Sequence, residues 1–343
     1  MDIQNHFYGH SAVLAAHAGL DRPRHFAGLL QHGWTPVTPI RTHFADLAGS
    51  APKGNLFTWT HSSRGWSEEE SIRETGFAST PIGSPALYLA DMVQRSGSAP
   101  RRTLGTVVFP FHGTRLLSVE GDQAAYAKEI FDREGPAVVC LHIDDLQRPE
   151  ILRAWTEAGH HITTAGERRD PQFLARIMWL LLNSEKVVSN RLATALVYAA
   201  AVETPVSIYG PHFQIAGIQE TSSEAYLKEL WPEFYDEGIP TSVLQDVANA
   251  ELGRDYMRSP EELRSLLGWD SRGFLPFANY WIGAPVAKAQ AILGLKKREV
   301  GAVVNEVKLS PLHFLKDPLE HLPDRLPKVV SNGLVAPAID YVG

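Results

Sequence analysis

The stretch VVSNRLATALVYAAAVETPVSIYG at residues 187–210 decides the fold. A short apolar run opens it, a Ser-Asn pair follows, a helical pattern rich in alanine occupies 193–203, and a second apolar run closes it at 205–210. Short apolar runs bounded by turn residues are typical of buried strands. The stretch therefore predicts a strand, a helix and a second strand, with Ser189 and Asn190 in the loop where the first strand ends.

Upstream of this stretch the same alternation is repeated. Strand-like runs and helical patterns follow one another, and the last helix before residue 187 takes Asp170 as its expected N-cap. We expect strands at 106–111, 137–143 and 160–166, and helices at 121–135, 148–159 and 170–184. Together with the strands at 186–190 and 205–210, joined by right-handed crossovers, they predict a doubly wound parallel sheet.

A second α/β unit is predicted ahead of this sheet. The run RSGSAPRR at 95–102 combines Gly, Ser, Pro and Arg without apolar periodicity, which indicates a linker. Before the linker we expect a helix at 11–20, strands at 26–34 and 55–60, a helix at 68–76, and a loop that continues as a helix over 79–93.

The whole chain is thus predicted to be an α/β protein with two Rossmann-like lobes and a helical extension. The lobes are expected at 1–100 and 103–220, and residues 221–343 should pack on both of them. Within the extension, 222–234 and 259–269 open with Ser and acidic residues, which favours helix N-termini. The Pro-rich tail from residue 311 is expected to wrap the surface.

The composition narrows the class of protein. With 44% hydrophobic and 21% charged residues the chain is an ordinary globular protein, and its net charge of -7 argues against nucleic-acid binding. A single cysteine, Cys140, excludes an intrachain disulfide and a Cys-based zinc site, and fits a reducing cytosol. Neither a membrane span nor a signal peptide is recognisable. We therefore expect a cytoplasmic protein, for which peripheral contact with a membrane stays open.

Candidate ligand contacts lie where the predicted strands end. In open α/β sheets, ligands bind beyond the carboxyl ends of the strands. The exit loops hold small residues, hydroxyls and basic groups, and a helix N-terminus after SNR adds N–H donors that suit a diphosphate. The candidates for this role are Gly113, Thr114, Gly166, Arg168, Ser189, Asn190, Thr194 and His212.

Several of these residues have structural alternatives. Ser189 and Asn190 can cap the following helix, and Arg168 can be a solvated surface charge. The pair Asp144-Asp145 can hold a divalent cation or form a turn and a helix cap. The chain contains no D-x-D motif, no P-loop and no G-x-G-x-x-G after a strand, so a metal-independent site built from basic groups and helix dipoles is the simpler prediction.

Histidines are the candidates for acid–base chemistry. His32, in QHG at the end of a predicted strand, is best placed to take a proton from an attacking hydroxyl. His10, in GHS, is the second candidate, and His112 can stabilise a departing phosphate. A structural role for each stays open. The histidine pairs lack a third ligand at a matching spacing, so no metal is expected.

Four segments resemble the GT-B glycosyltransferases, especially bacterial transferases of the capsule, lipopolysaccharide and teichoic-acid type. They are FAGLLQHGW at 26–34, FTWT at 57–60, TPIGSP at 80–85, and the stretch at 187–210. In such enzymes the last of these is similar to the nucleotide-sugar site. The chain departs from the pattern because it lacks the E-x(7)-E signature of many retaining members, and its first lobe is short.

The resemblance implies a metal-independent glycosyltransferase that moves a sugar from a nucleotide-sugar donor to a hydroxyl acceptor, without a cofactor. Residues 110–114 and 189–195 would hold the diphosphate, 165–171 the base or ribose, and the acceptor would enter from the first lobe. Two rivals stay open: a sugar-nucleotide epimerase on the same scaffold, and a non-catalytic protein that binds a nucleotide or a partner. The donor base, the sugar, the acceptor, the stereochemical outcome and the oligomeric state stay open.

Overall fold

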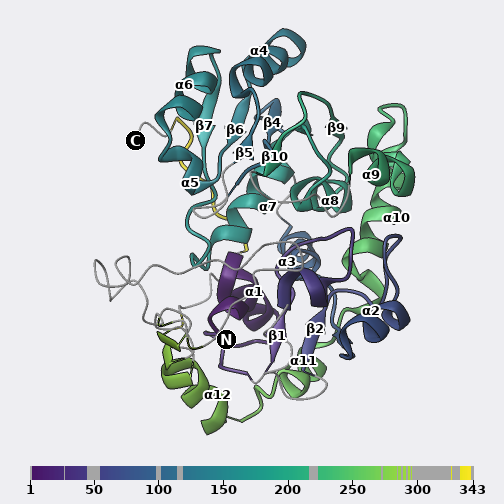
Figure 1. The fold of residues 1–343 in the computed structure, drawn as a ribbon, viewed down its shortest axis with the longest axis vertical. Coiled ribbons are helices and arrows are strands. Elements are labelled where there is room, and N and C mark those ends of the chain that lie inside the picture. The colour runs from purple at the N-terminus through teal and green to yellow at the C-terminus, as the bar shows by residue number, and fades with distance from the viewer. Residues whose placement is uncertain are drawn as a thin grey trace.

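The described part of the chain contains two parallel β-sheets, a two-stranded antiparallel pair, and helices packed around them (Figure 1). The computed structural model describes residues 2–26, 28–44, 55–97, 102–113, 119–215, 223–271, 273–283 and 333–340, and isolated positions between 285 and 326. The mixed α/β class with parallel sheets, expected from the sequence, is confirmed.

The larger sheet has five parallel strands in the order β7-β6-β4-β8-β9. Its strands are β4 (Thr106–Val108), β6 (Val138–Cys140), β7 (His161–Thr163), β8 (Lys186–Ser189) and β9 (Val206–Ile208). The chain runs outward from β4 to β7, then returns to β8 on the other side of β4. The strand order therefore reverses between β4 and β8, which is where open α/β sheets bind ligands. All five predicted strands are confirmed.

Alternate residues of each strand face opposite layers of helices. Val108 and Val139 pack with α4 (Gln123–Glu134) and α6 (Pro149–Glu157), whereas Val107 and Val138 belong to the core that includes α7 (Phe173–Asn183) and α8 (Thr194–Ala201). Burial on both faces explains why the strands are continuous apolar runs rather than alternating ones. A four-residue helix, α5 (Ile143–Leu146), follows β6.

The smaller sheet has the parallel order β1-β2-β3. It consists of β1 (Leu29–Leu30), β2 (Leu56–Thr58) and β3 (Thr80–Pro81), accompanied by α1 (His10–His17), α2 (Glu68–Thr75) and α3 (Pro85–Arg95). Leu30, Phe57 and Ile82 share one hydrophobic core with α7 and α8. The α7–α8 face of the large sheet is therefore packed against the small sheet by buried apolar contacts.

Four helices are described after the large sheet, and the first three contribute buried residues to the core that the two sheets share. They are α9 (Glu224–Leu230), α10 (Thr241–Leu252), α11 (Pro260–Leu266) and α12 (Phe274–Ala278). The predicted helices at 222–234 and 259–269 are confirmed in part, because α9 is followed by a short 3₁₀ turn at Pro232–Tyr235 and α11 is shorter. Helix α10 packs against α8.

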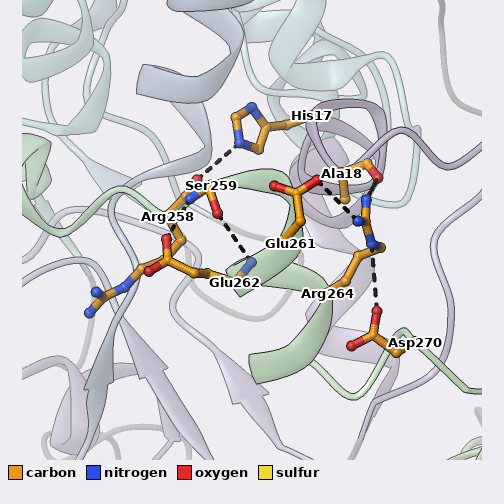
Figure 2. A network of polar contacts seen from close by, with 8 residues as sticks. All are labelled: His17, Ala18, Arg258, Ser259, Glu261, Glu262, Arg264 and Asp270. Carbon is orange, nitrogen blue, oxygen red and sulfur yellow. Dashed lines mark hydrogen bonds and ion pairs between the residues drawn. The ribbon is translucent and has the colours of Figure 1, made fainter.

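A polar network joins α11 to the end of α1 (Figure 2). The His17 ring donates to the Arg258 carbonyl at 3.0 Å, and the Arg264 guanidinium donates to the Ala18 carbonyl at 2.7 Å. Ser259 and Glu262 form the reciprocal capping box that the sequence pattern indicated. The Ala18 carbonyl at the end of α1 thus gains a donor from α11, and His17 of α1 donates to the backbone just ahead of α11. The two bonds hold α11 against α1.

Two details differ from the sequence prediction. Helix α7 begins at Phe173 with Gln172 as its N-cap, so the N-cap prediction for Asp170 is wrong. Asp170 instead accepts the Gln172 backbone N–H at 2.8 Å, which forms a turn ahead of the helix. The antiparallel pair β5 (Val119–Glu120) and β10 (Gln214–Ile215) was not foreseen.

The described end of the C-terminal tail crosses from the small sheet to the large one. Gly333 lies near Leu89 and Val93 of α3, and Ile339 forms an antiparallel bridge with Thr163 of β7. The Thr163 hydroxyl donates to the Ala338 carbonyl at 2.6 Å. Most of the tail predicted to wrap the surface lies outside the described residues.

Candidate functional site

The loop between β8 and α8 is shaped by its own side chains. Asn190 Oδ1 accepts the Phe111 N–H at 2.8 Å, and its Nδ2 donates to the Pro211 carbonyl at 2.9 Å. One amide thus ties together the loops that leave β4, β8 and β9. The buried Ser189 Oγ accepts the Arg191 N–H at 3.4 Å. Neither residue is the N-cap of α8, so the capping alternative is wrong for both.

The N-terminus of α8 meets the loop that leaves β1. Ala193 is the N-cap of α8 and gives no side-chain cap, which leaves the polar helix end toward this junction. Thr194 Oγ1 accepts the Trp34 backbone N–H at 3.0 Å. A Cβ on Gly33 would lie 3.6 Å from the same hydroxyl. The carboxyl ends of the two sheets therefore face each other at Gly33 and Thr194.

The loop after β7 packs against the N-terminal segment. The Tyr8 N–H donates to the Arg168 carbonyl, and the Arg168 guanidinium lies 4.8 Å from the centre of the Phe7 ring. A Cβ on Gly9, whose φ is +73°, would lie 2.5 Å from the Pro171 carbonyl oxygen, so only glycine permits this approach. Arg168 is solvent-exposed but anchored beside the small sheet.

Gly166 in the same loop has a conformational role. Its φ is +94°, and a Cβ there would lie 2.9 Å from the Arg176 guanidinium. Arg176 donates to the Asp170 carboxylate at 2.7 Å and to the Ala165 carbonyl at 2.8 Å. The left-handed turn at Gly166 therefore lets the loop fold over an internal ion pair.

Three histidines gather at the exit of β1. His32 Nε2 lies 3.3 Å from His43 Nδ1, and the two rings are edge to face at 4.4 Å. His10, at the start of α1, is buried, and Tyr8 has contacts to both His10 and His32, with ring centres at 6.0 and 5.9 Å. This "histidine group" (His10, His32 and His43) combines two predicted catalytic residues with one that the sequence did not single out.

Burial keeps these imidazoles neutral. Loss of hydration and, to a lesser extent, the nearby His32 lower the pKa of His10 to about 3. Burial likewise lowers the pKa of His32 to about 4, and the positive charge of Arg168 adds to this effect. The pKa of His43 is also lowered by burial and by the two other rings. Neutral imidazoles can accept protons, as the predicted base chemistry requires.

A second pair of rings lies at the exits of β4 and β6. The exposed His112 stacks on His142 with ring centres 4.5 Å apart and an angle of 7°. His112 Nδ1 donates to the Gly113 carbonyl at 2.7 Å, which leaves Nε2 as the acceptor of the neutral ring. His142 Nδ1 accepts the Asp144 N–H at 3.2 Å, so its Nε2 carries the hydrogen.

Arg168 links the two sets of histidines electrostatically. Burial is the main reason that the pKa of His142 falls to about 4, and the charges of His112 and Arg168 lower it as well. The Arg168 charge acts on His32 in the same direction. Burial raises the pKa of Tyr8, which also senses Arg168 and Asp144. The Arg168 charge therefore acts on rings at the exits of both β1 and β6.

The remaining predicted residues lie farther from this centre or outside the description. His212 is exposed after β9, and its Nδ1 is 3.7 Å from Glu224 Oε2. Gly113 is buried beside His112, whereas Thr114 lies outside the described residues. Arg168, Thr194, His10 and His32 lie where the loops that leave β1, β7 and β8 contact one another and the N-terminal segment, and His112 lies at the exit of β4 beside His142.

Two histidines of the candidate site, His142 and His43, were not predicted as site residues from the sequence. His142 directly follows the buried residues 137–141 and lies just beyond β6, so the strand-exit rule that selected His112 also applies to it. His43 lies in a π-helical turn, Ile40–Phe44, with no local signal. Asp144 and Asp145 belong to α5. Within the described residues, no group of three or more His, Cys, Asp or Glu side chains is arranged to hold a metal ion.

The chain has only weak similarity to known proteins. No family model and no curated protein matches the chain. A structure described as a UDP-N-acetylglucosamine 2-epimerase from Listeria monocytogenes is 14% identical, with a TM-score of 0.34 over 75% of this chain and 63% of that one. Two structures of the wall teichoic acid polymerase TagF give 9% and 11% identity and TM-scores of 0.27 and 0.24, over 79% and 70% of this chain and 66% and 58% of theirs.

The chain spans less than two thirds of the length of the chain in each of these three structures. TM-scores this low establish neither a shared topology nor a shared activity. No helix within the described ranges combines the length and apolar character needed to cross a bilayer.

Proposed function

We propose that the protein is a glycosyltransferase that moves a sugar from a nucleotide-sugar donor to a hydroxyl acceptor, with its two sheets belonging to two facing lobes. The observation that carries the proposal is the Trp34–Thr194 contact, where the carboxyl ends of both parallel sheets meet. Ligands of open parallel sheets bind at these ends. A site between two such edges has room for a donor on one side and an acceptor on the other.

The donor would lie on the edge of the large sheet. The α8 N-terminus, opened by the Asn190-tied loop and free of a side-chain cap, supplies backbone N–H groups and partial positive charge for a diphosphate. Arg168 adds a full positive charge on the same side of the histidine group. These groups support a metal-independent mechanism, because they offset the negative charge that develops on the leaving phosphate.

The acceptor would lie on the edge of the small sheet, next to the histidine group. His32 is the proposed base, with His10 as the second choice. Both rings are neutral at neutral pH and stand beside the guanidinium that would face the leaving group. Buried His10 Nδ1 has no hydrogen-bond partner among the described residues, and such a buried polar atom calls for a ligand or a water.

Nucleotide binding tests this proposal directly. We would follow the thermal unfolding of the full chain with CMP, CDP, UDP, GDP and dTDP and with their sugar derivatives, each with and without Mg²⁺. A ligand at 100 times its dissociation constant stabilises the native state by ~2.7 kcal/mol, which moves the midpoint by a few degrees. A shift for one base series without Mg²⁺ supports the proposal, and no shift for any nucleotide overturns it.

Turnover then separates the rivals. Sugar transfer that requires an added hydroxyl acceptor identifies a transferase. Interconversion of a nucleotide sugar without any acceptor identifies the epimerase alternative. Nucleotide binding without either reaction identifies a binding protein, because one fold serves many functions.

A further inference from the structure

His43 carries a buried ring nitrogen to which no role has been assigned. Its Nδ1 faces His32 Nε2 at 3.3 Å, whereas its Nε2 is buried and has no hydrogen-bond partner among the described residues. Nearly all buried polar atoms of native proteins are hydrogen-bonded, so an exception calls for a water, a ligand or a functional role. The Nε2 side of His43 is therefore open to a ligand.

This nitrogen lies beside the N-terminus of α8. The position that a Cβ would take on Gly33 is 3.8 Å from His43 Nε2 and 3.6 Å from Thr194 Oγ1. Because Gly33 has no side chain, this point between the imidazole and the first residue of α8 stays open. We call it the Gly33 gap. The N-cap of α8 gives no side-chain hydrogen bond, so the imidazole borders the polar end of an uncapped helix.

The charges around the Gly33 gap suit an anion. Among the described residues, the side-chain charges that act on the His32 and His43 rings are those of Arg168 and of other histidines, and no carboxylate acts on either ring. The N-terminus of α8 adds partial positive charge and backbone N–H groups. A phosphate in this place would meet a positive potential from both sheets.

We propose that His43 Nε2 donates a hydrogen bond to a phosphate oxygen of the donor, which lies in the Gly33 gap against the N-terminus of α8. The inference rests on the proposed transferase function and adds to it a phosphate contact from the side of the small sheet. A neutral imidazole with its hydrogen on Nε2 accepts at Nδ1, so His32 Nε2 donates to His43 Nδ1. One chain of hydrogen bonds then joins the proposed base to the phosphate.

Titration calorimetry of the full chain with CDP, UDP, GDP and dTDP, without Mg²⁺, tests the proposal. His43→Phe keeps an aromatic ring but removes both nitrogens. For the diphosphate that binds the unaltered protein, it should reduce the affinity about 10- to 100-fold, which is the effect of losing a hydrogen bond to a charged group.

A second variant closes the Gly33 gap without removing any hydrogen-bonding group. Gly33→Ala places a methyl group 3.3 Å from His43 Cε1, and Gly33 lies outside the left-handed region, so its backbone accepts alanine. We expect at least a tenfold loss of affinity here as well. The control Gly238→Ala adds a methyl group at an exposed turn and should bind as the unaltered protein does. Thermal unfolding without ligand checks that each variant is folded.

Failure of this inference can be told apart from failure of the proposed function. Unchanged affinity in either His43→Phe or Gly33→Ala overturns the inference, and the transferase proposal then stands if Arg168→Ala still weakens binding. If none of the four diphosphates binds the unaltered protein, both are overturned. Should His43→Phe not fold, the Gly33→Ala result decides alone, because that variant leaves the histidine group intact.

Discussion

The backbone N–H of Trp34 donates to Thr194 Oγ1 at 3.0 Å across 160 positions of sequence. Trp34 follows His32 in the loop that leaves β1, and Thr194 is the first residue of α8. The Trp34 indole in turn donates to the buried Glu251 carboxylate at 2.9 Å. The two hydrogen bonds of Trp34 hold the loop that contains His32, the predicted base, next to the N-terminus of α8, the predicted diphosphate site.

Replacing the Thr194 hydroxyl should therefore destabilise the protein. Thr194→Val keeps the shape of the side chain but leaves the partly buried Trp34 N–H without its acceptor, which costs about 1–3 kcal/mol. Urea denaturation measures this as a lower midpoint with an unchanged slope. Thr156→Val is the control, because that exposed hydroxyl bonds only to its own helix. Equal stability of the two variants would contradict the role given to Thr194.

Arg168→Ala should weaken the binding of nucleoside diphosphates while leaving the fold intact. The side chain is exposed, so its loss leaves no cavity, whereas a charge-assisted contact to phosphate is worth about 1.5–3 kcal/mol. That corresponds to a loss of roughly 10- to 100-fold in affinity by titration calorimetry. The control Arg153→Ala removes an exposed arginine from α6. Unchanged affinity in Arg168→Ala would remove this residue from the donor site.

Folding stability should fall in mild acid because of the buried histidines. The folded-state pKa values of His10 and His32 are about 3 and 4, below the ordinary value of 6.5. As the pH falls below about 6.5 the unfolded chain takes up protons first, so stability is complete above this value and declines toward the folded-state pKa values. Each such histidine contributes a slope of about 1.4 kcal/mol per pH unit.

The variant His10→Gln tests this linkage. For each protein, the free energy of unfolding is compared with that protein's own value at about pH 7.5. Between about pH 6 and pH 5, the free energy of unfolding of His10→Gln should fall less steeply with pH than that of the unaltered protein, by the contribution of one histidine. Urea denaturation at a series of pH values gives both slopes. Parallel curves for the two proteins would show that His10 does not stay neutral in the folded state.

The strands of the large sheet could be predicted from the sequence because each one is marked by residues next to one another in the chain. Val187 and Val188 lie in a short apolar run between polar turns, and such a run in a strand–helix alternation has few other structures to adopt. The strand-exit rule then placed His112 and Arg168 at one edge of the large sheet, since carboxyl ends of parallel strands share an edge, and placed His32 at the exit of a strand in the first lobe. The roles of individual side chains in the site depend instead on contacts between segments that are distant in the sequence.

Asn190 and His43 show why those roles were not predictable. The Asn190 amide is occupied by Phe111 and Pro211, which are 79 and 21 positions away, so nothing near residue 190 reveals a bracing role. His43 reaches His32 only because the chain turns back after β1. Both cases depend on tertiary packing, whereas sequence patterns report local structure.

His32→Ala should lower turnover while sparing the affinity for the donor. General base catalysis contributes ~10²–10⁴-fold, and His32 stands on the acceptor side of the site. Because His43 Nδ1 engages His32 Nε2 at 3.3 Å, His43→Ala should change the pH profile of turnover without abolishing it. The control His161→Ala removes an exposed histidine on β7. Sugar-transfer assays at saturating donor measure the turnover of all three variants. Normal turnover in His32→Ala would contradict the assignment of His32 as the base.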